Sequence, residues 1–221
     1  MAEGKTDLGT IQVQGVGEVN VEPDLLMVDL GVVTEGKTVQ AAQEQNRRQV
    51  GKVLHKLKAN GVERKDVRTL RYAIIPVYDH SPAKEGKPPR LVAYRVENVL
   101  SVKIRNLERA GSIIDATVGD GANQVMNLRF GLSNETQARQ RAFRLAVQEA
   151  VQKGQLMAEA VGKEITGLQS VREQPGGGPR PLSALGEGAR VYGETPVAPG
   201  ELTIRASVTA VFTINSRWGQ R

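Results

Sequence analysis

The chain has 221 residues, of which 39% are hydrophobic and 24% charged, an ordinary composition for a globular protein with a buried core. It contains no cysteine, which excludes disulfides, thiolate metal sites and a cysteine nucleophile. No apolar run approaches the roughly 20 residues that a transmembrane helix needs. The polar residues 1–10 carry no signal-peptide core, so either the protein is cytoplasmic or the numbering begins after a removed signal.

The net charge of +6 is unevenly distributed along the sequence. Between Arg47 and Arg109 there are 16 Lys or Arg and 6 Asp or Glu, a local excess of +10, so the rest sums to −4. This segment either binds an anionic lipid, glycan or nucleic acid, or is a solvated surface. Aromatic residues do not alternate with the cations, which argues against nucleic acid. The candidate anion-binding residues are Arg47, Arg48, Lys52, Lys56, Arg68 and Arg71.

Two strands are predicted near the N-terminus. Residues 11–16 alternate apolar and polar side chains, which is typical of a strand with one buried face. Residues 25–33 are apolar on both faces, which predicts a strand that lies centrally in a sheet or between a sheet and a partner. A turn at Pro23-Asp24 separates them, and we expect the Asp24 carboxylate to accept hydrogen bonds from the backbone amides just ahead.

A helix and a wide hairpin follow these strands. Thr38 is the expected N-cap of a helix over residues 38–60, and Gly61 ends it. The alternation over 67–78 and 91–105 predicts two strands that pair across a Pro-rich loop. The apolar alternation of the first of these strands consists of Leu70, Tyr72 and Ile74.

The second half of the chain repeats the strand–helix–strand–strand order. After a short helix over 107–118, its elements are a strand over 124–132, a helix over 135–161, and strands over 164–173 and 201–215. A long mobile loop is expected over 174–200. The apolar positions of the long helix are Ala138, Ala142, Leu145, Ala146, Ala150, Met157 and Val161.

We therefore expect an α+β fold of duplicated β-α-β-β units, with mainly antiparallel or mixed sheets packed against two long helices. The first unit spans 11–105 and the second 106–215, which includes a linking helix over 106–120. Residues 1–10 and 216–221 are expected to be flexible tails. The exposed faces and edges of the long strands are natural surfaces for subunit contact.

No constellation of residues indicates catalysis, and we expect no catalytic, cofactor or metal site. Gly15-Val16-Gly17 lacks the third glycine of a dinucleotide fingerprint, and no helix follows it. His55 and His80 are isolated; Asp79 beside His80 could form a weak loop site or simply lie on the surface. No Asp/Glu pair is placed for a hydrolase.

A tight turn is expected at Gly121-Ala122-Asn123, because Gly and Asn tolerate positive φ. Asn98 lies within an apolar strand face, and a buried amide at this position is expected to be satisfied rather than to act as a ligand. A hydrogen bond between Asn98 and this turn would explain both features.

The order and spacing of several short motifs resemble the SIMPL-domain family. The motifs are Gly15-x-Gly17, Pro23-Asp24, the passage over 31–42, Thr69 ahead of Pro76-x-Tyr78, Tyr94-x-Val96-x-Asn98, Gly121-Ala122-Asn123 leading to Phe130, and Pro199-Gly200. The resemblance extends from Ile11 to Ile214. It implies a non-enzymatic, exported bacterial protein of the periplasm or cell envelope, in a family linked in some members to oxidative stress and in one to large rings.

Two hypotheses follow. The first is a self-associating structural or interaction protein of the envelope, a homo-oligomer such as a ring, without catalysis or a small-molecule substrate. The alternative is a binding module for an anionic partner through the basic first helix, with a membrane surface as one such partner. Binding of this second kind weakens steeply with salt.

Overall fold

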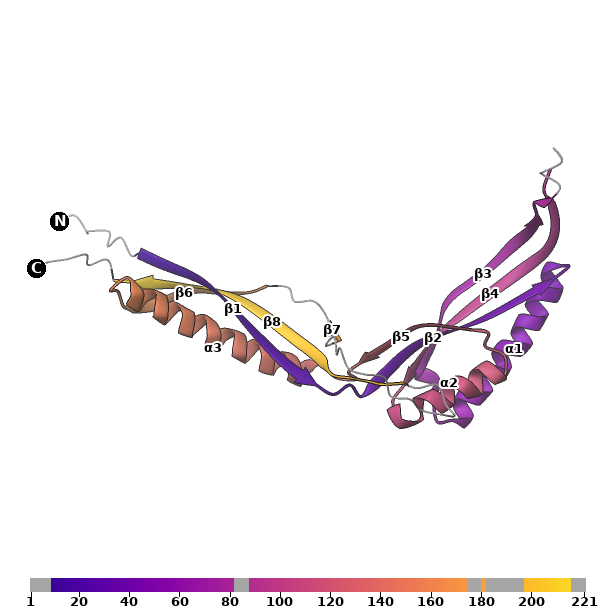
Figure 1. Ribbon diagram of the computed structural model, residues 1–221, viewed down its shortest axis with the longest axis horizontal. Helices are drawn as coiled ribbons and strands as arrows, with labels where there is room; N and C mark the ends of the chain where they lie inside the picture. Colours follow the sequence, from indigo (N-terminus) through magenta and orange to yellow (C-terminus); the bar gives the residue numbers. More distant parts are fainter. Residues whose placement is uncertain (1–8, 82–87, 175–179, 182–196, 216–221) are drawn as a thin grey trace, which may run out of the picture. The chain divides into compact units, whose positions relative to one another are not determined.

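The computed structural model describes residues 9–81, 88–174, 180–181 and 197–215 (Figure 1). The described residues form two compact units, each an antiparallel sheet with helical cover, which confirms the predicted α+β class. The central unit comprises residues 23–81, 88–132 and 197–199. The terminal unit comprises the remainder, which includes the described residues nearest both ends of the chain.

The central unit is built on a four-stranded sheet with the order β3-β4-β2-β5. Its strands are β2 (Leu25–Gly36), β3 (Val67–Asp79), β4 (Arg90–Ile104) and β5 (Gln124–Gly131). As predicted, the strand that is apolar on both faces lies centrally, and the two strands that flank the Pro-rich loop pair with each other. The helices α1 (Val39–Ala59) and α2 (Ala110–Gly119) share one buried core with β2 and β4.

Local signals define both ends of α1. The hydroxyl of Thr38 accepts a hydrogen bond from the backbone N–H of Ala41 at 3.2 Å, as expected of an N-cap. At the other end, Gly61 adopts a positive φ of 84°, and the N–H of Val62 donates to the carbonyl of Leu57 at 3.0 Å. This is a Schellman ending, in which glycine lets the chain leave the helix. Thr38 and Gly61 therefore have their predicted roles.

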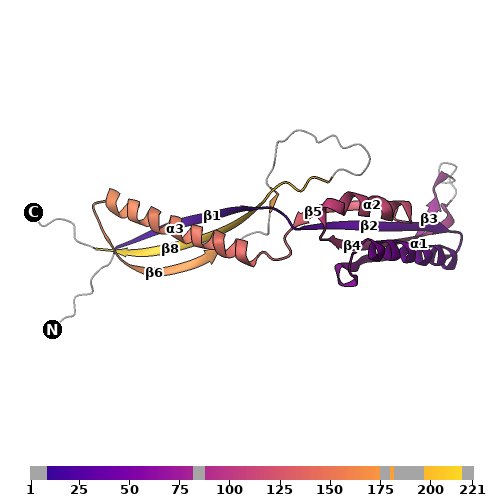
Figure 2. The ribbon, with the colours of Figure 1, turned by 90° about the horizontal axis from the view of Figure 1, so that it is seen from below.

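The terminal unit has the strand order β1-β8-β6, with β1 at Gly9–Val21, β8 at Leu202–Ile214 and β6 at Ile165–Gln174. A two-residue strand, β7 (Arg180–Pro181), pairs with one end of β8. The helix α3 (Thr136–Ala160) crosses β1 and β8, whereas β6 lies to one side (Figure 2).

The strand pairing differs from two independent β-α-β-β repeats. The strand before α3, β5, pairs with β2 in the central unit, and β1 takes the corresponding place beside β8. The observed units therefore exchange one strand relative to the predicted ranges 11–105 and 106–215. The N-terminal strand also begins at Gly9, two residues inside the predicted flexible tail. The tail over 216–221 and most of the loop over 174–200 lie outside the described residues.

Close contact between α3 and β1 explains why β1 belongs to the terminal sheet. A Cβ atom built on Gly17 would lie 1.9 Å from the carbonyl oxygen of Ala142, and one on Gly15 would lie 2.0 Å from that of Ala146. Both positions therefore require glycine while the helix lies this close to the strand. The predicted structural importance of Gly15 and Gly17 thus arises from packing.

This short separation also determines which side chains of α3 are buried. The buried stripe contains only small residues, Ala138, Ala142, Ala146, Ala150, Gly154 and Ala158. Leu145, Met157 and Val161 were expected on the same face, but they are 44%, 48% and 55% exposed. That part of the prediction is wrong, because the narrow space between helix and sheet admits methyl groups and not longer side chains.

Candidate functional site

Most of the predicted anion-binding residues are already paired with carboxylates of the chain. Arg47 and Arg48 both contact Glu44, at 2.9 and 3.1 Å, and hydrogen bonds from Arg47 hold the pKa of Glu44 below its ordinary value. Lys56 pairs with Asp120 at 2.9 Å and Arg71 with Glu97 at 3.5 Å. Within the described part of the chain, Lys52 and Arg68 have no ion-pair partner. Four of the six candidate residues are therefore engaged within the chain.

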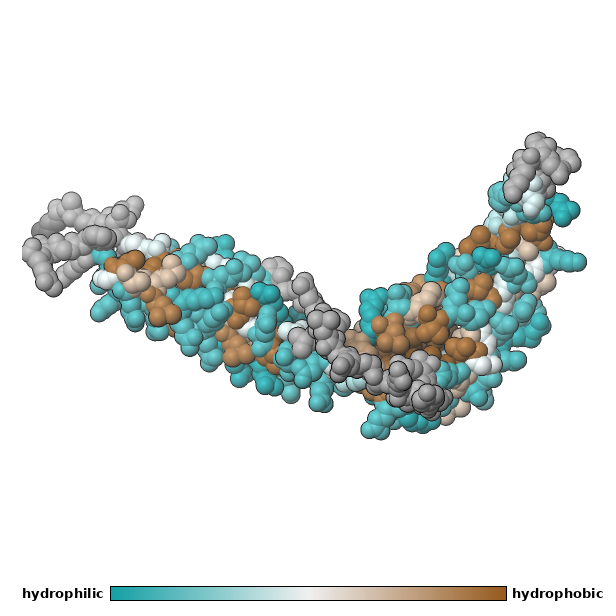
Figure 3. Space-filling model, viewed as in Figure 1, coloured by the Kyte–Doolittle hydropathy of each residue, from teal (hydrophilic) through white to brown (hydrophobic). Residues whose placement is uncertain are grey.

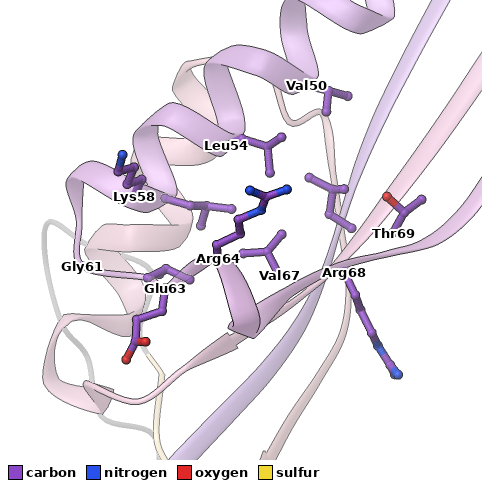
Figure 4. Close-up of a pocket in the computed structure, with 12 residues that line it drawn as sticks. Val50, Leu54, Lys58, Gly61, Glu63, Arg64, Val67, Arg68 and Thr69 are labelled. Atoms are coloured by element: carbon purple, nitrogen blue, oxygen red, sulfur yellow. The ribbon is translucent and has the colours of Figure 1, made fainter.

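A pocket of about 830 Å³ lies between the C-terminal half of α1, the short 3₁₀ helix η1 (Arg64–Asp66) and the start of β3 (Figure 4). Its apolar lining consists of Val50, Leu54, Leu57, Val62, Val67 and Leu100. Thr69, Gly61 and the charged residues Lys58, Glu63, Arg64 and Arg68 complete the lining. The volume lies within the roughly 300–1,000 Å³ typical of small-molecule sites.

The pocket exists because α1 packs over β2 and β4 and leaves the edge strand β3 largely uncovered. Leu57 and Leu100 are 1% and 3% exposed and form its inner wall. Leu54, which the apolar spacing of the helix places on the same face, is 41% exposed because no strand side chain covers it. The pocket is therefore an open continuation of the hydrophobic core.

Arg64 is the charged residue that reaches over this apolar surface. Its guanidinium group lies between Leu54 and Val67, whereas the side chain of Arg68 points away (Figure 4). Glu63 is paired with Lys65 at 2.8 Å, and Arg64 has no ion pair or hydrogen-bond partner among the described residues. Arg64 was not among the residues expected to bind an anion; its signal in the sequence is a cation three residues after the glycine that ends α1.

Among the edge strands that the helices leave largely uncovered, β5 carries Val125 and Leu128, which are 43% and 40% exposed, and β3 and β6 carry two further apolar surfaces. We name these surfaces the β3 strip and the β6 strip. The β3 strip contains Leu70, Tyr72, Ile74 and Tyr78, with Leu91 and Val92 of β4, and each is between 38% and 52% exposed. The β6 strip contains Leu168 and Val171, which are 56% and 41% exposed. Figure 3 shows hydrophobic side chains along the β3–β4 hairpin.

The turn at Gly121-Ala122-Asn123 has the predicted backbone. Gly121 has a positive φ of 143°, and a Cβ atom there would lie 3.2 Å from the backbone oxygen of Gln49. The Asn123 amide donates to the carbonyl of Val33 at 2.7 Å and accepts from its N–H at 2.9 Å. Its backbone N–H donates to the carbonyl of Gly31 at 2.9 Å. The turn therefore fixes β5 against β2.

The remaining motif residues are structural in a different way from that expected. The side-chain oxygen of Asn98 is buried without a hydrogen-bond partner in the described part of the chain, so the expectation that this amide is satisfied is wrong, and this oxygen accepts no hydrogen bond from the turn. Tyr94 is half-buried on β4, opposite Pro76 of β3. Pro23 precedes β2, and the backbone N–H of Asp24 donates to the carbonyl of Gly131 at 3.2 Å.

Within the described ranges, no three His, Asp or Glu side chains gather as a metal site would require. His55 is exposed on α1, and His80 is exposed just after β3. Asp79 accepts a hydrogen bond from the N–H of Ser81 at 2.9 Å, which lowers the pKa of its carboxyl group. Among the helices that are described, none combines the length and apolar character needed to cross a bilayer.

The fold and these surfaces define an α+β protein with two antiparallel sheets, uncovered apolar edge strands and the amphipathic pocket beside η1. Residues 11–212 match the model of the SIMPL family, described as "Protein of unknown function (DUF541)". The chain belongs to this family, as its motifs indicated.

Two curated relatives illustrate the match. The chain is 30% identical over 218 residues to the 26 kDa periplasmic immunogenic protein of Brucella melitensis. The aligned region covers 95% of this chain and 86% of that protein. The chain is 23% identical over 162 residues to the uncharacterized protein YggE of Escherichia coli, and this aligned region covers 73% of this chain and 64% of YggE.

Proposed function

We propose that this protein is a non-enzymatic, self-associating interaction protein of the bacterial cell envelope. The observation that carries the proposal is the pair of uncovered apolar surfaces, the β3 strip and the β6 strip, each on the edge strand of its sheet. Exposed apolar surface next to unpaired backbone groups favours association with another chain. Other copies of the same chain carry the same two strips and are the partner proposed for them.

The edge strands differ in how open their backbone groups are to such association. The edge of β1 is protected because side chains of α3 bind its backbone groups. No corresponding side-chain bonds to the backbone of β3 or β6 are found among the described residues, apart from the bond that Glu164 makes just ahead of β6. This contrast supports assembly through β3 and β6, of which a closed ring is one form.

The envelope assignment is supported by the name of the Brucella relative, which is called periplasmic. A link to oxidative or envelope stress is part of the proposal through the family resemblance alone. The alternative, an anion-binding module on α1, has weaker support, because four of its six residues are paired with carboxylates.

The test is the mass in solution, measured by light scattering after size exclusion at several protein concentrations. The expected wild-type result is a discrete mass several times the 23.9 kDa of one chain. Tyr78 and Leu91 are direct partners across the hairpin, so the double variant Tyr78→Lys, Leu91→Lys should shift the mass toward one chain. Leu168→Lys tests the β6 strip separately.

A matched control is Leu156→Lys, because Leu156 is 65% exposed on α3 and lies outside both strips. This variant should keep the wild-type mass. Circular dichroism of all variants should be unchanged, since each substituted residue is exposed. A wild-type protein that remains a monomer at every concentration, or strip variants that keep the wild-type mass, would contradict the proposal.

A further inference from the structure

The pocket beside η1 has the chemistry of a site for an amphipathic anion. Its wall is aliphatic, with Leu57, Leu100 and Val62 buried at its base and Leu54 open to the solvent at its side. Among the described residues that line it, none is aromatic. An aliphatic wall without aromatic rings suits a flexible hydrocarbon chain better than a nucleobase or sugar ring, which typically stack on aromatic side chains.

The charged residues of the lining are three cations, Lys58, Arg64 and Arg68, and the carboxylate of Glu63. The guanidinium of Arg64 lies over the apolar wall and has no partner among the described residues (Figure 4). A planar guanidinium matches a carboxylate with two parallel hydrogen bonds. The hydroxyl of Thr69 is a second polar group of the lining. The other cations of the lining, Lys58 and Arg68, are exposed at its rim.

We propose that this pocket binds a long-chain fatty acid, with the carboxylate on Arg64 and the hydrocarbon tail along Leu54, Leu57, Val67 and Leu100. Arg64 is the lining cation that lies over the apolar wall, and one guanidinium group matches one carboxylate head group. A volume of about 830 Å³ accommodates a single chain. The proposal is independent of self-association: it concerns a face between α1 and β3, and it holds for one chain as well as for an assembly.

Isothermal titration calorimetry of the full chain with dodecanoate, below the concentration at which it forms micelles, tests the proposal. One dodecanoate should bind per chain. Butanoate has the same head group without the tail, and 1-dodecanol has the same tail without the charge; both should bind at least about tenfold more weakly, because each lacks one of the two interactions.

Two variants locate the site. Arg64→Gln removes the cation, and it should weaken dodecanoate binding by about tenfold or more while leaving 1-dodecanol unchanged. Leu54→Asp places a carboxylate on the tail-binding wall and should abolish binding of dodecanoate. Both residues are exposed, so unfolding temperatures should remain close to that of the wild type. Lys52→Gln is the matched control, an exposed cation of α1 that does not line the pocket.

Absence of dodecanoate binding would overturn the proposal, as would butanoate binding of equal strength. Equal binding by the wild type, Arg64→Gln and Leu54→Asp would place the ligand elsewhere and would overturn it too. These outcomes leave the proposed self-association unaffected, because that is measured by the mass of the protein without ligand.

Discussion

Glu149 of α3 accepts a hydrogen bond from the backbone N–H of Val16 in the edge strand β1. One turn later, the ammonium group of Lys153 donates to the backbone carbonyl of Gln14 at 3.2 Å, and it pairs with Glu149 at 3.0 Å. The helix thus satisfies a donor and an acceptor that the strand would otherwise present to another chain. An edge closed in this way resists unwanted pairing.

This contact predicts a pH-dependent contribution to stability. The hydrogen bond from Val16 and the neighbouring Lys153 lower the pKa of Glu149 below its ordinary value of 4.5. The contribution should therefore be complete above that ordinary value and should disappear as the pH falls through the lowered pKa. Urea unfolding of the wild type and Glu149→Gln should differ at pH 7 and converge in strong acid. Glu159→Gln, an exposed carboxylate of the same helix, should match the wild type throughout.

Two glycine substitutions should have opposite effects on stability, because only one of the two glycines lies in the close contact between α3 and β1. Gly17→Ala places a methyl group against the backbone of Ala142 and should lower the free energy of unfolding by about 1–3 kcal/mol or more. Gly51→Ala lies in α1 with no atom within 4 Å of the new methyl group, so it should raise stability by about 0.5–1 kcal/mol. Chemical denaturation measures both; a neutral Gly17→Ala would contradict the packing argument.

The buried carboxylate of Asp66 fixes η1 to the end of β4. It accepts two hydrogen bonds from Arg105, at 2.8 and 3.0 Å, and these hold the pKa of Asp66 below its ordinary value. Asp66→Asn should reduce the free energy of unfolding at pH 7 by about 1–3 kcal/mol, toward the lower end because Arg105 is about half exposed. The loss should vanish in acid, where the wild-type carboxylate is protonated.

A matched control for this prediction is Glu63→Gln. Glu63 pairs with Lys65 in the same segment, but both side chains are more than half exposed. Loss of this ion pair should change the free energy of unfolding by less than about 0.5 kcal/mol. Equal losses from both variants would mean that burial of Asp66 is not what makes its ion pair effective.

Asn127 predicts a ranked series of variants. It has a positive φ of 50°, and its amide donates to the buried carboxylate of Asp29 at 2.9 Å. Asn127→Gly keeps the backbone conformation and loses the hydrogen bond, whereas Asn127→Val loses the bond and adds backbone strain of about 1–2 kcal/mol. The unfolding temperature should be highest for the wild type, lower for Asn127→Gly and lowest for Asn127→Val. A valine variant as stable as the glycine variant would contradict the strain.

Features that depend on neighbouring residues could be predicted from the sequence. Thr38 and Gly61 act on the helix that lies between them, so their residue types suffice to mark its ends. The two apolar faces of residues 25–33 likewise predicted a central strand, and β2 lies between β4 and β5 in the sheet. The alternation of Leu70, Tyr72 and Ile74 predicted a strand correctly. It gave no information on which face a helix covers.

The strand exchange could not be predicted in this way. Gly15 and Gly17 were visible as a motif, but their packing partners, Ala142 and Ala146, lie more than a hundred residues away in the sequence. Of the two candidate strands, β1 pairs with β8, and its glycines lie against α3. Arg64 was likewise one of 16 cations in the basic segment, and only the uncovered core beside it distinguishes it.

The position of β8 between β1 and β6 has a consequence for how the chain matures. The core strands and helices of the central unit are complete once residues 23–132 have been synthesised, whereas Gly15 must wait for Val208 to gain its partner. A chain that emerges from its N-terminus onward therefore holds β1 unpaired until the last strand arrives. Loss of the final strand through premature termination would leave β1, β6 and α3 without a sheet to join, while the central unit keeps its own.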